Sequence, residues 1–302
     1  MVPIVIISGS IILFMAFFIF HRIMLHTERG KIQHIGTFVE VDGHNMNVYS
    51  KGQEAEVHVP IILMSGSGVT SPIYDYKLLY DRLANKYKVV VIEKFGYGYS
   101  DTSGLPRDVA TMVDEDRKAL IKAGIHPPYV LMPHSMSALE SIWWVHAYPD
   151  EIEKIIGLDM AVPESYSESN MGKITLMRVM TCFGIHRIPM FCPAKRACLT
   201  DDEYKQNRLL AYRNTLGRDV YHECAAVQAN AKAVGKLHVP SVPMLMFTTN
   251  LGGGSGHENW MKAQTDFANR AENCTQIFLD CEHNLHFEKS EYVAQEIIKF
   301  LT

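Results

Sequence analysis

The sequence predicts an α/β fold in which a doubly wound, mostly parallel sheet follows one N-terminal transmembrane helix. Three observations support this prediction. A long apolar stretch opens the chain, short apolar runs that suit buried strands alternate with helical stretches, and small or polar residues stand directly after those runs. Strands that alternate with helices of ten or more residues are typical of parallel βαβ units. The 302 residues suffice for one large domain with an insertion and an anchor.

The apolar stretch covers residues 2–20, which contain no charged side chain and only two serines as polar residues. As a helix it would extend about 28 Å, roughly the thickness of one hydrocarbon core. We therefore expect a single-pass membrane helix. A cleaved signal peptide is the alternative, but no Lys or Arg precedes the run and no small-x-small site ends it. Arg22, Arg29 and Lys31 follow the stretch, which places the downstream domain in the cytoplasm.

The next residues predict the first part of the sheet. Two alternating segments, 37–41 and 46–49, flank Asp42-Gly43, which is a strong signal for a hairpin turn. The apolar runs that follow indicate strands, and the stretches between them indicate helices. We expect strands at 60–64, 88–92, 129–132 and 154–158, and helices at 74–86, 107–123 and 138–146.

The alternation of strands and helices breaks between residues 163 and 235, where Met-rich and aromatic helical stretches contain no clear buried strand. We interpret this segment as a helical cap inserted over one end of the sheet. Strands resume at 242–248 and 276–279, with helices at about 259–271 and 292–301. The predicted organisation is an anchor with a basic flank (1–31), a first part of the core (32–162), the cap (163–235) and a second part of the core (236–302).

Composition and spacing exclude several classes of protein. The net charge of −4 comes without any Lys/Arg-rich block, so the sequence shows no electrostatic footprint for nucleic acid. The six cysteines form no C-x-x-C pair, and we expect reduced thiols, although a bridge among Cys182, Cys192 and Cys198 stays open. No metal site is expected, because His283 and His286 lack a further ligand cluster. Since no complete dinucleotide fingerprint occurs either, we expect no cofactor.

The residues that follow the predicted strands are suited to acyl transfer. In an open parallel sheet, ligands bind outside the carboxyl ends of the strands. Ser135 stands at a sharp turn between a strand and a helix, Asp159 ends the next strand, and His283 follows the last strand. Acyl transfer requires a nucleophile, a base and an acid that holds the base in one tautomer. These three residues can fill those roles.

Four motifs resemble the α/β-hydrolase family, and together they cover most of the chain after the apolar stretch. The nucleophile elbow G-x-S-x-G of that family corresponds to residues 133–137, where Pro133 and Ser137 replace the two glycines. Residues 281–288 resemble the family's terminal G-H-x-x-H-x-E pattern. The other two motifs are Ser65-Gly66-Ser67-Gly68 and the turn from Gly96 to Asp101.

The resemblance implies a role for each site residue. Ser135 would be the nucleophile and His283 the general base, while the backbone N–H groups of Met136 and Ser67 would form the oxyanion hole. His134 would pack beneath the elbow without a chemical role. His286 would lie behind the base or on the substrate side.

The acid is assigned by the same resemblance. Many members of the family carry it after the strand that here covers 243–248, but Asn250 stands there and an amide cannot be the anionic partner. Asp159 occupies the other known location and is the expected acid. Glu258, which follows a Gly-rich loop, is the alternative.

The sequence thus predicts a membrane-anchored serine hydrolase that cleaves a carboxylic ester through an acyl-enzyme. The anchor and the apolar cap favour a lipidic ester as the substrate. Its expected partners are a small acyl substrate and, through the N-terminal helix, the membrane. A serine nucleophile argues against the epoxide hydrolase and haloalkane dehalogenase branches, which use an aspartate there. Amide, peptide or thioester hydrolysis are alternatives, as is a relative that binds a ligand without catalysis.

Overall fold

The computed structural model of the protein describes residues 2–52, 59–166, 171–192, 194–251 and 257–302. For residues 2–11 it describes the backbone only. Within these ranges eight strands form one sheet in the order β1-β2-β4-β3-β5-β6-β7-β8. The first two pairs are antiparallel and the others are parallel. The strands are β1 Thr37–Val41, β2 His44–Lys51, β3 Ile61–Met64, β4 Val89–Glu93, β5 Tyr129–Pro133, β6 Ile152–Leu158, β7 Met244–Thr249 and β8 Cys274–Leu279.

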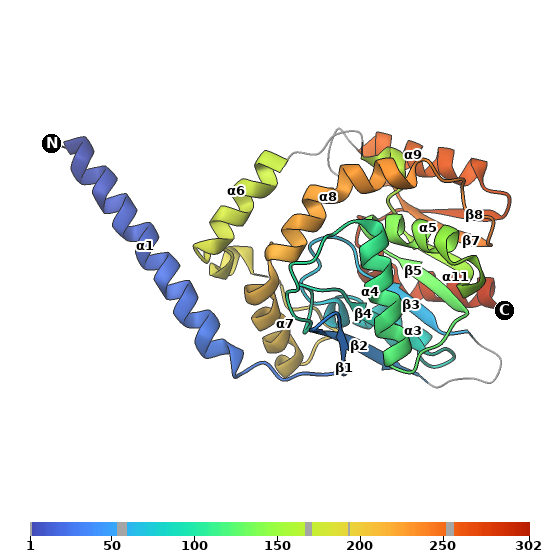
Figure 1. The fold of residues 1–302 in the computed structure, drawn as a ribbon, viewed down its shortest axis with the longest axis horizontal. Coiled ribbons are helices and arrows are strands. Elements are labelled where there is room, and N and C mark those ends of the chain that lie inside the picture. Colours follow the sequence, from blue (N-terminus) through green and yellow to red (C-terminus); the bar gives the residue numbers. More distant parts are fainter. Residues whose placement is uncertain (1, 53–58, 167–170, 193, 252–256) are drawn as a thin grey trace.

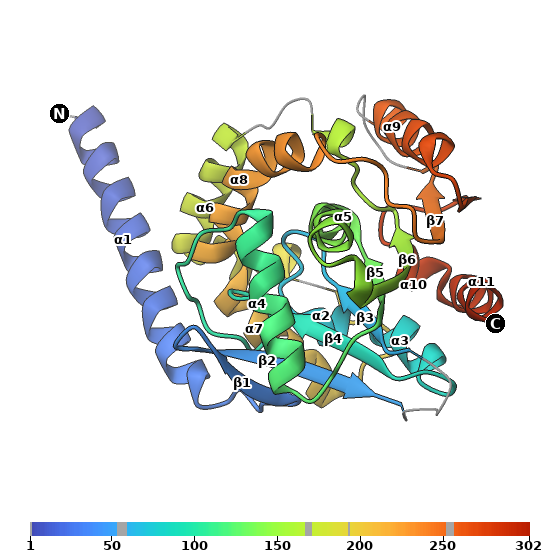
Figure 2. The same cartoon turned by 45° about the vertical axis from the view of Figure 1, so that its right-hand side comes forward.

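Helices cover both faces of the sheet (Figures 1 and 2). One face packs against α4, α5 and α9, and the other against α3 and α11. Along β3, Ile62 and Met64 belong to the first core while Ile61 and Leu63 belong to the second, as the period of two in a strand requires. The helices of this core are α2 Pro72–Asp75, α3 Lys77–Leu83, α4 Val109–Lys122, α5 Ala138–Ala147, α9 His257–Arg270, α10 Leu285–Glu288 and α11 Ser290–Leu301.

The sequence predicted most of these elements. Asp42 and Gly43 both have positive φ, at 50° and 84°, as a two-residue hairpin turn of this type needs. The continuous apolar runs form β3, β4 and β5, in which every residue is buried. The single helix expected at 74–86 is wrong, because it divides at Tyr76 into α2 and α3. Tyr76 leaves the helical path with its side chain fully buried, and its hydroxyl reaches the functional site described below.

The segment from 163 to 235 contributes no strand among its described residues. It holds the helices α6 Met171–Cys182, α7 Asp201–Asn214 and α8 Arg218–Val234, with short 3-10 turns η3 Pro163–Ser165, η4 Ile185–Arg187 and η5 Pro189–Phe191. Further 3-10 turns in the core are η1 Ser135–Ser137 and η2 Pro149–Glu151. Figure 1 shows α6 and α8 side by side, with α6 farther from the sheet than α8, which also packs against the core.

The N-terminal helix α1, Val2–Arg29, projects from the body of the molecule (Figure 1). In the part of the chain that the structure describes, no helix has both the length and the apolar character of a membrane span. The transmembrane helix predicted over 2–20 is therefore not supported. The side chains of its residues 2–11 lie outside the described set.

Candidate active site

A strained turn presents Ser135 at the end of β5. The serine has a φ of 54°, in the left-handed region that side chains other than glycine rarely occupy. The Ala161 N–H donates to the Ser135 carbonyl oxygen at 2.8 Å, which fixes the backbone of the turn. The side chain of Ser135 is half-buried, and α5 follows directly after η1. This is the strand-to-helix turn that the sequence predicted.

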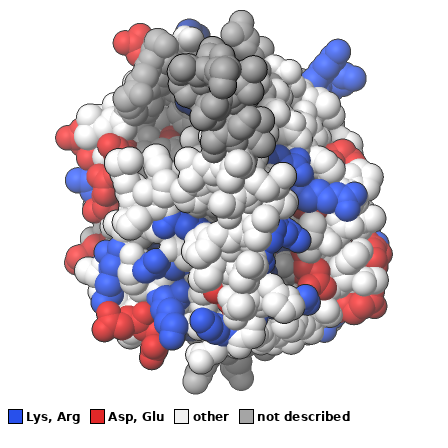
Figure 3. All heavy atoms as spheres, turned by 90° about the vertical axis from the view of Figure 1, so that its left-hand side faces the viewer, with Lys and Arg blue, Asp and Glu red and all other residues white. Residues whose placement is uncertain are grey.

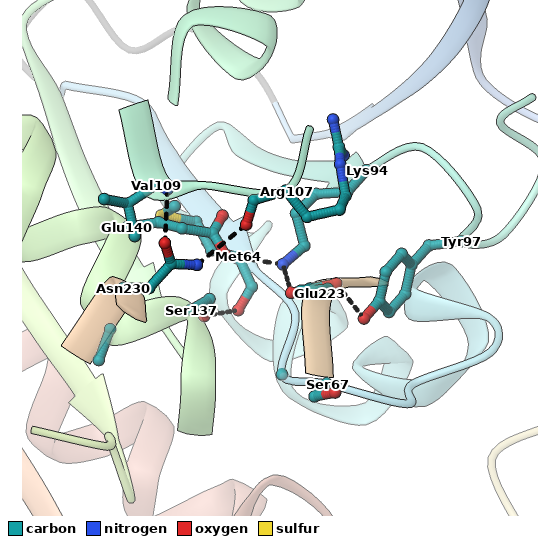
Figure 4. A network of polar contacts seen from close by, with 12 residues as sticks. Met64, Ser67, Lys94, Tyr97, Arg107, Val109, Ser137, Glu140, Glu223 and Asn230 are labelled. Atoms are coloured by element: carbon teal, nitrogen blue, oxygen red, sulfur yellow. Dashed lines mark hydrogen bonds and ion pairs between the residues drawn. The ribbon is translucent and has the colours of Figure 1, made fainter. Parts of the chain in front are cut away.

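The two residues that replace the glycines of the elbow have different effects. Pro133 ends β5 in register with Met64, and the next N–H, of His134, donates to the Met64 carbonyl oxygen at 3.0 Å. Hydrogen bonding to β3 therefore continues past the proline. The fully buried Ser137 places its Oγ 2.8 Å from the same carbonyl oxygen. A glycine could not make this contact, so Ser137 adds a hydrogen bond between the elbow and β3 (Figure 4).

Asp159 and His283 are in contact across the carboxyl edge of the sheet. The Nδ1 atom of His283 lies 2.5 Å from Oδ2 of Asp159, which follows β6. The other carboxylate oxygen, Oδ1, accepts hydrogen bonds from Gln264 Nε2 at 2.9 Å and from Trp260 Nε1 at 3.2 Å. The Oγ1 hydroxyl of Thr249 donates to Oδ2 at 2.9 Å. The carboxylate, only 1% exposed, is therefore held in one orientation.

The hydrogen bonds around Asp159 keep it ionised. Burial by itself raises the pKa of this carboxyl group. The hydrogen bond and charge of His283, together with the donors from Gln264 and Thr249, outweigh burial and hold the pKa below its usual range. The group is therefore an anion at neutral pH.

The alternative acid, Glu258, lies in the first turn of α9 with an exposed side chain. Within the described residues, no hydrogen bond or ion pair joins it to His283. Helix α9 instead supplies Trp260 and Gln264, which both donate to Asp159. The structure thus brings His283 together with Asp159 and leaves Glu258 apart.

The loop after β3 passes very close to the elbow. A Cβ atom placed on Gly66 would lie 2.9 Å from the Cβ of Ser135 and 3.0 Å from Nδ1 of His134. Real side chains essentially never approach so closely, so only glycine fits at this position. Ser67, whose N–H was predicted as an oxyanion donor, follows on the same loop. The second predicted donor, the N–H of Met136, lies on η1 directly after Ser135.

His134 lies beneath the elbow, as the sequence predicted, but it also contacts the loop of the base. Its Nε2 is 3.2 Å from the carbonyl oxygen of His283, and its Nδ1 is 2.9 Å from the hydroxyl of Tyr76. Burial, with the neighbouring charges of His286 and His283, holds the pKa of His134 well below its usual range. The ring is therefore neutral, with one donor and one acceptor nitrogen.

The hydrogen-bond partners of the His134 ring show which of its nitrogens donates and which accepts. A carbonyl oxygen only accepts, so the Nε2–H of His134 donates to His283 and Nδ1 accepts from the Tyr76 hydroxyl. That hydroxyl oxygen in turn accepts from the N–H of Gly66 at 3.3 Å. One chain of hydrogen bonds thus links the loop after β3, the elbow and the loop of the base. No pattern in the sequence indicated Tyr76 in this position.

His286 lies behind His134, with their ring centroids 4.9 Å apart. Its Nε2 is 3.4 Å from Oδ2 of Asp75, which forms an ion pair with Arg196 at 2.7 Å. The side chain of His286 is fully buried. It therefore belongs to the support of the site.

A buried charge network connects the cap to the loop after β3 (Figure 4). Lys94 Nζ lies 2.7 Å from Glu140 on α5 and 2.6 Å from Glu223 on α8. The Tyr97 hydroxyl donates to Glu223 at 2.6 Å and accepts from the N–H of Gly68 at 3.4 Å. Burial lowers the pKa of Lys94, but the two carboxylates outweigh it, so the pKa lies above its usual range. The ammonium group therefore stays charged although it is 2% exposed.

Sequence reasoning missed Glu223 and its neighbour Cys224, whose Sγ lies 3.2 Å from Oγ of Ser67. Glu93, the last residue of β4, supports the turn from Gly96 to Asp101. It is fully buried and accepts from the Tyr99 N–H at 2.7 Å and from Asn47 Nδ2 at 2.9 Å. All six cysteines are free thiols. The described residues include no group of three or more side chains that could hold a metal ion.

No family model matches the sequence. Cfl2 from Burkholderia cenocepacia has a similar structure, with a TM-score of 0.70 at 17% identity over 88% of this chain and 95% of that chain. The epoxide hydrolase CorEH gives 0.64 at 14% identity over 88% and 98% of the two chains. Est816, an N-acyl homoserine lactone degrading enzyme, gives 0.65 at 14% identity over 87% and 100%. The predicted α/β-hydrolase fold is confirmed, and hydrolytic enzymes are among its structural neighbours.

One protein found by sequence comparison has a much higher identity to this chain than these structures do. The uncharacterized protein YbdG of Bacillus subtilis (strain 168) is 35% identical over 240 residues, which cover 76% of this chain and 73% of that protein. Identity at this level over most of both chains indicates common descent, not merely a shared fold. The chain therefore belongs to the family of Bacillus subtilis YbdG, and it has the α/β-hydrolase fold.

Proposed function

We propose that this protein is a serine hydrolase that cleaves a carboxylic ester. The observation that carries the proposal is the 2.5 Å contact between Nδ1 of His283 and the buried carboxylate of Asp159. If Nδ1–H donates to Asp159, Nε2 is left with its lone pair and can accept a proton. A histidine held in this tautomer beside a strained serine turn is suited to acyl transfer.

In the proposed reaction, Ser135 Oγ attacks the acyl carbonyl carbon while His283 Nε2 takes the hydroxyl proton. The N–H groups of Met136 and Ser67 stabilise the oxyanion. The tetrahedral intermediate expels the alcohol, which receives the proton from His283, and an acyl-enzyme remains. Water then attacks this ester with His283 as base, and collapse of the second intermediate releases the acid and returns the proton to Ser135. Asp159 keeps the imidazole oriented and stabilises its charged form.

The choice of an ester rests on the nucleophile and on one structural neighbour. A hydroxyl at position 135 forms an acyl-enzyme, which esters enter more readily than amides. Est816, an N-acyl homoserine lactone degrading enzyme, shares the fold, and a lactone is a cyclic ester. Amide, peptide and thioester bonds are the competing acyl substrates.

A fluorophosphonate probe tests the nucleophile directly. Wild type should be labelled, and Ser135→Ala should lose the label while it keeps the unfolding temperature of wild type. Equal labelling of both proteins would exclude Ser135. A panel of p-nitrophenyl esters from acetate to palmitate then orders the acyl chains. Binding of an ester with thermal stabilisation but no hydrolysis would instead indicate a relative without catalysis.

We also propose that the chain is attached to a membrane through α1, with the catalytic body in the cytoplasm. The exposed apolar side chains from Ile12 to Ile23 and the basic residues Arg22 and Arg29 support this proposal. Extraction of a membrane fraction with alkaline carbonate tests it. Recovery of the intact full chain in the soluble fraction without extraction would contradict attachment.

A further inference from the structure

Most of the exposed large apolar side chains of the described residues gather on two segments. The first is α1 between Ile12 and Ile23, and the second is the cap between Leu176 on α6 and Phe191 on η5. Met190 alone is 80% exposed. Monomeric soluble proteins rarely expose a contiguous apolar surface of this kind without a partner. We refer to these two segments together as the apolar face.

The two segments pack against each other and share an ion pair, although more than 150 residues separate them in the chain. The rings of Phe14 and Phe18 on α1 meet Phe183 of the cap edge to face, at centroid distances of 5.4 and 6.2 Å. The Arg187 guanidinium group donates to both carboxylate oxygens of Glu28, at 2.9 and 2.7 Å. This bidentate pair is nearly buried, with 10% of each side chain exposed. The apolar face is therefore one continuous surface.

Charge around the apolar face points to the chemistry of its partner. Figure 3 shows uncharged side chains through the centre of this side of the molecule, Lys and Arg along both flanks, and Asp and Glu toward the rim. A cavity of about 370 Å³ lies beside α1 where its apolar part ends, and Arg22, Arg29 and Arg213 line it together with the carboxylates of Glu28 and Asp101. Two of those arginines, Arg22 and Arg29, are exposed.

An apolar surface with basic side chains beside it matches the interface of an anionic bilayer, where acyl chains and negative headgroups meet. We propose that the whole apolar face docks on an anionic lipid bilayer, so that the tip of the cap, and not α1 alone, contacts the membrane. The inference rests on the proposed membrane attachment, but it does not depend on hydrolysis. Docking in this orientation places the cap against lipid, and it therefore favours substrates that partition into the bilayer.

Quenching by brominated lipid tests the contact in the full chain. Met190→Trp places an indole on η5, and the matched control Phe278→Trp places one on β8, at 55% exposure and at the opposite end of the molecule from α1 (Figure 1). Both proteins are mixed with vesicles of phosphatidylcholine and phosphatidylglycerol with brominated acyl chains. We expect the added emission of Met190→Trp to fall at least twofold, while that of Phe278→Trp stays unchanged.

Three other outcomes would contradict the proposed contact between the cap and the bilayer. If both variants associate with vesicles and neither is quenched, attachment through α1 holds and contact by the cap is overturned. If no variant associates with vesicles, both the attachment and this inference fail. Self-association in sedimentation without quenching would assign the apolar face to a second copy of the chain. Ser135→Ala should behave as wild type in vesicle binding, so a failure of the proposed hydrolysis is seen separately.

Discussion

The side chain of His134 is hydrogen-bonded to the backbone of His283, with 3.2 Å between Nε2 and the carbonyl oxygen. The residue next to the proposed nucleophile thereby holds the loop of the proposed base. The ring of His134 lies 4.7 Å from that of His283 between centroids, so the two imidazoles also pack together. Because His134 is neutral and buried, its contribution is to position the base.

His134→Ala should lower kcat for p-nitrophenyl acetate about tenfold and leave KM nearly unchanged, because the loop of His283 loses a hydrogen bond that the acyl pocket does not use. His134→Gln, which can still donate to the carbonyl oxygen, should recover part of kcat. Steady-state kinetics and an unfolding temperature for each variant check this. Equal kcat values for the Ala and Gln variants would argue that His134 acts through packing alone.

Asp159→Asn should lower kcat by about 10³- to 10⁴-fold, because an amide can hold the imidazole in the wrong tautomer. The matched control is Glu258→Gln on α9, which should stay within about twofold of wild type because no hydrogen bond or ion pair joins Glu258 to His283 in the described part of the chain. Kinetics with p-nitrophenyl acetate distinguish the two. A large effect at Glu258 and a small one at Asp159 would reverse the assignment of the acid.

Asp159 should also contribute to the dependence of stability on pH. Its pKa is below the usual range in the folded state and about 3.9 when unfolded. A depressed pKa means that the contribution is present above about pH 4 and is lost as the pH falls through the folded-state value. Wild type should therefore lose more stability than Asp159→Asn in this range. Urea unfolding of both proteins between about pH 2 and pH 7 measures the difference, and parallel curves would contradict it.

The sequence predicted the parts of the molecule that depend on local pattern. Continuous apolar runs gave β3, β4 and β5, and the position directly after β6 indicated Asp159 as a site residue. The contact of Tyr76 with His134 could not be predicted, because it depends on a break between two short helices that packing enforces. The transmembrane helix was inferred from apolar length alone, and the structure does not support it.

The partners of the buried charged residue of the cap, Glu223, could also not be predicted from the sequence. Glu223 stands in a helix with many polar residues, and nothing in its neighbourhood distinguishes it from a solvated acid. Its partners, Lys94 and Tyr97, lie about 130 residues earlier in the chain. Pairings over such distances follow from the tertiary fold, so a single sequence carries no signal for them.

Glu223→Ala should therefore destabilise the protein by about 3 kcal/mol or more, since it removes one partner of a buried ion pair and leaves Lys94 with Glu140 alone. It should also lower kcat more than it raises KM, because Tyr97 loses the acceptor that holds it against Gly68 on the proposed oxyanion loop. The control is Glu272→Ala, an exposed acid that should change stability by less than about 0.5 kcal/mol.

Glu223→Gln separates the two effects. The amide oxygen can still accept from Tyr97, so kcat should recover more than stability does, while the lost charge still weakens the pairing with Lys94. Urea denaturation and kinetics on the same preparations give both quantities. If kcat tracks stability equally in the Ala and Gln variants, the network holds the cap in place without positioning the loop of Ser67.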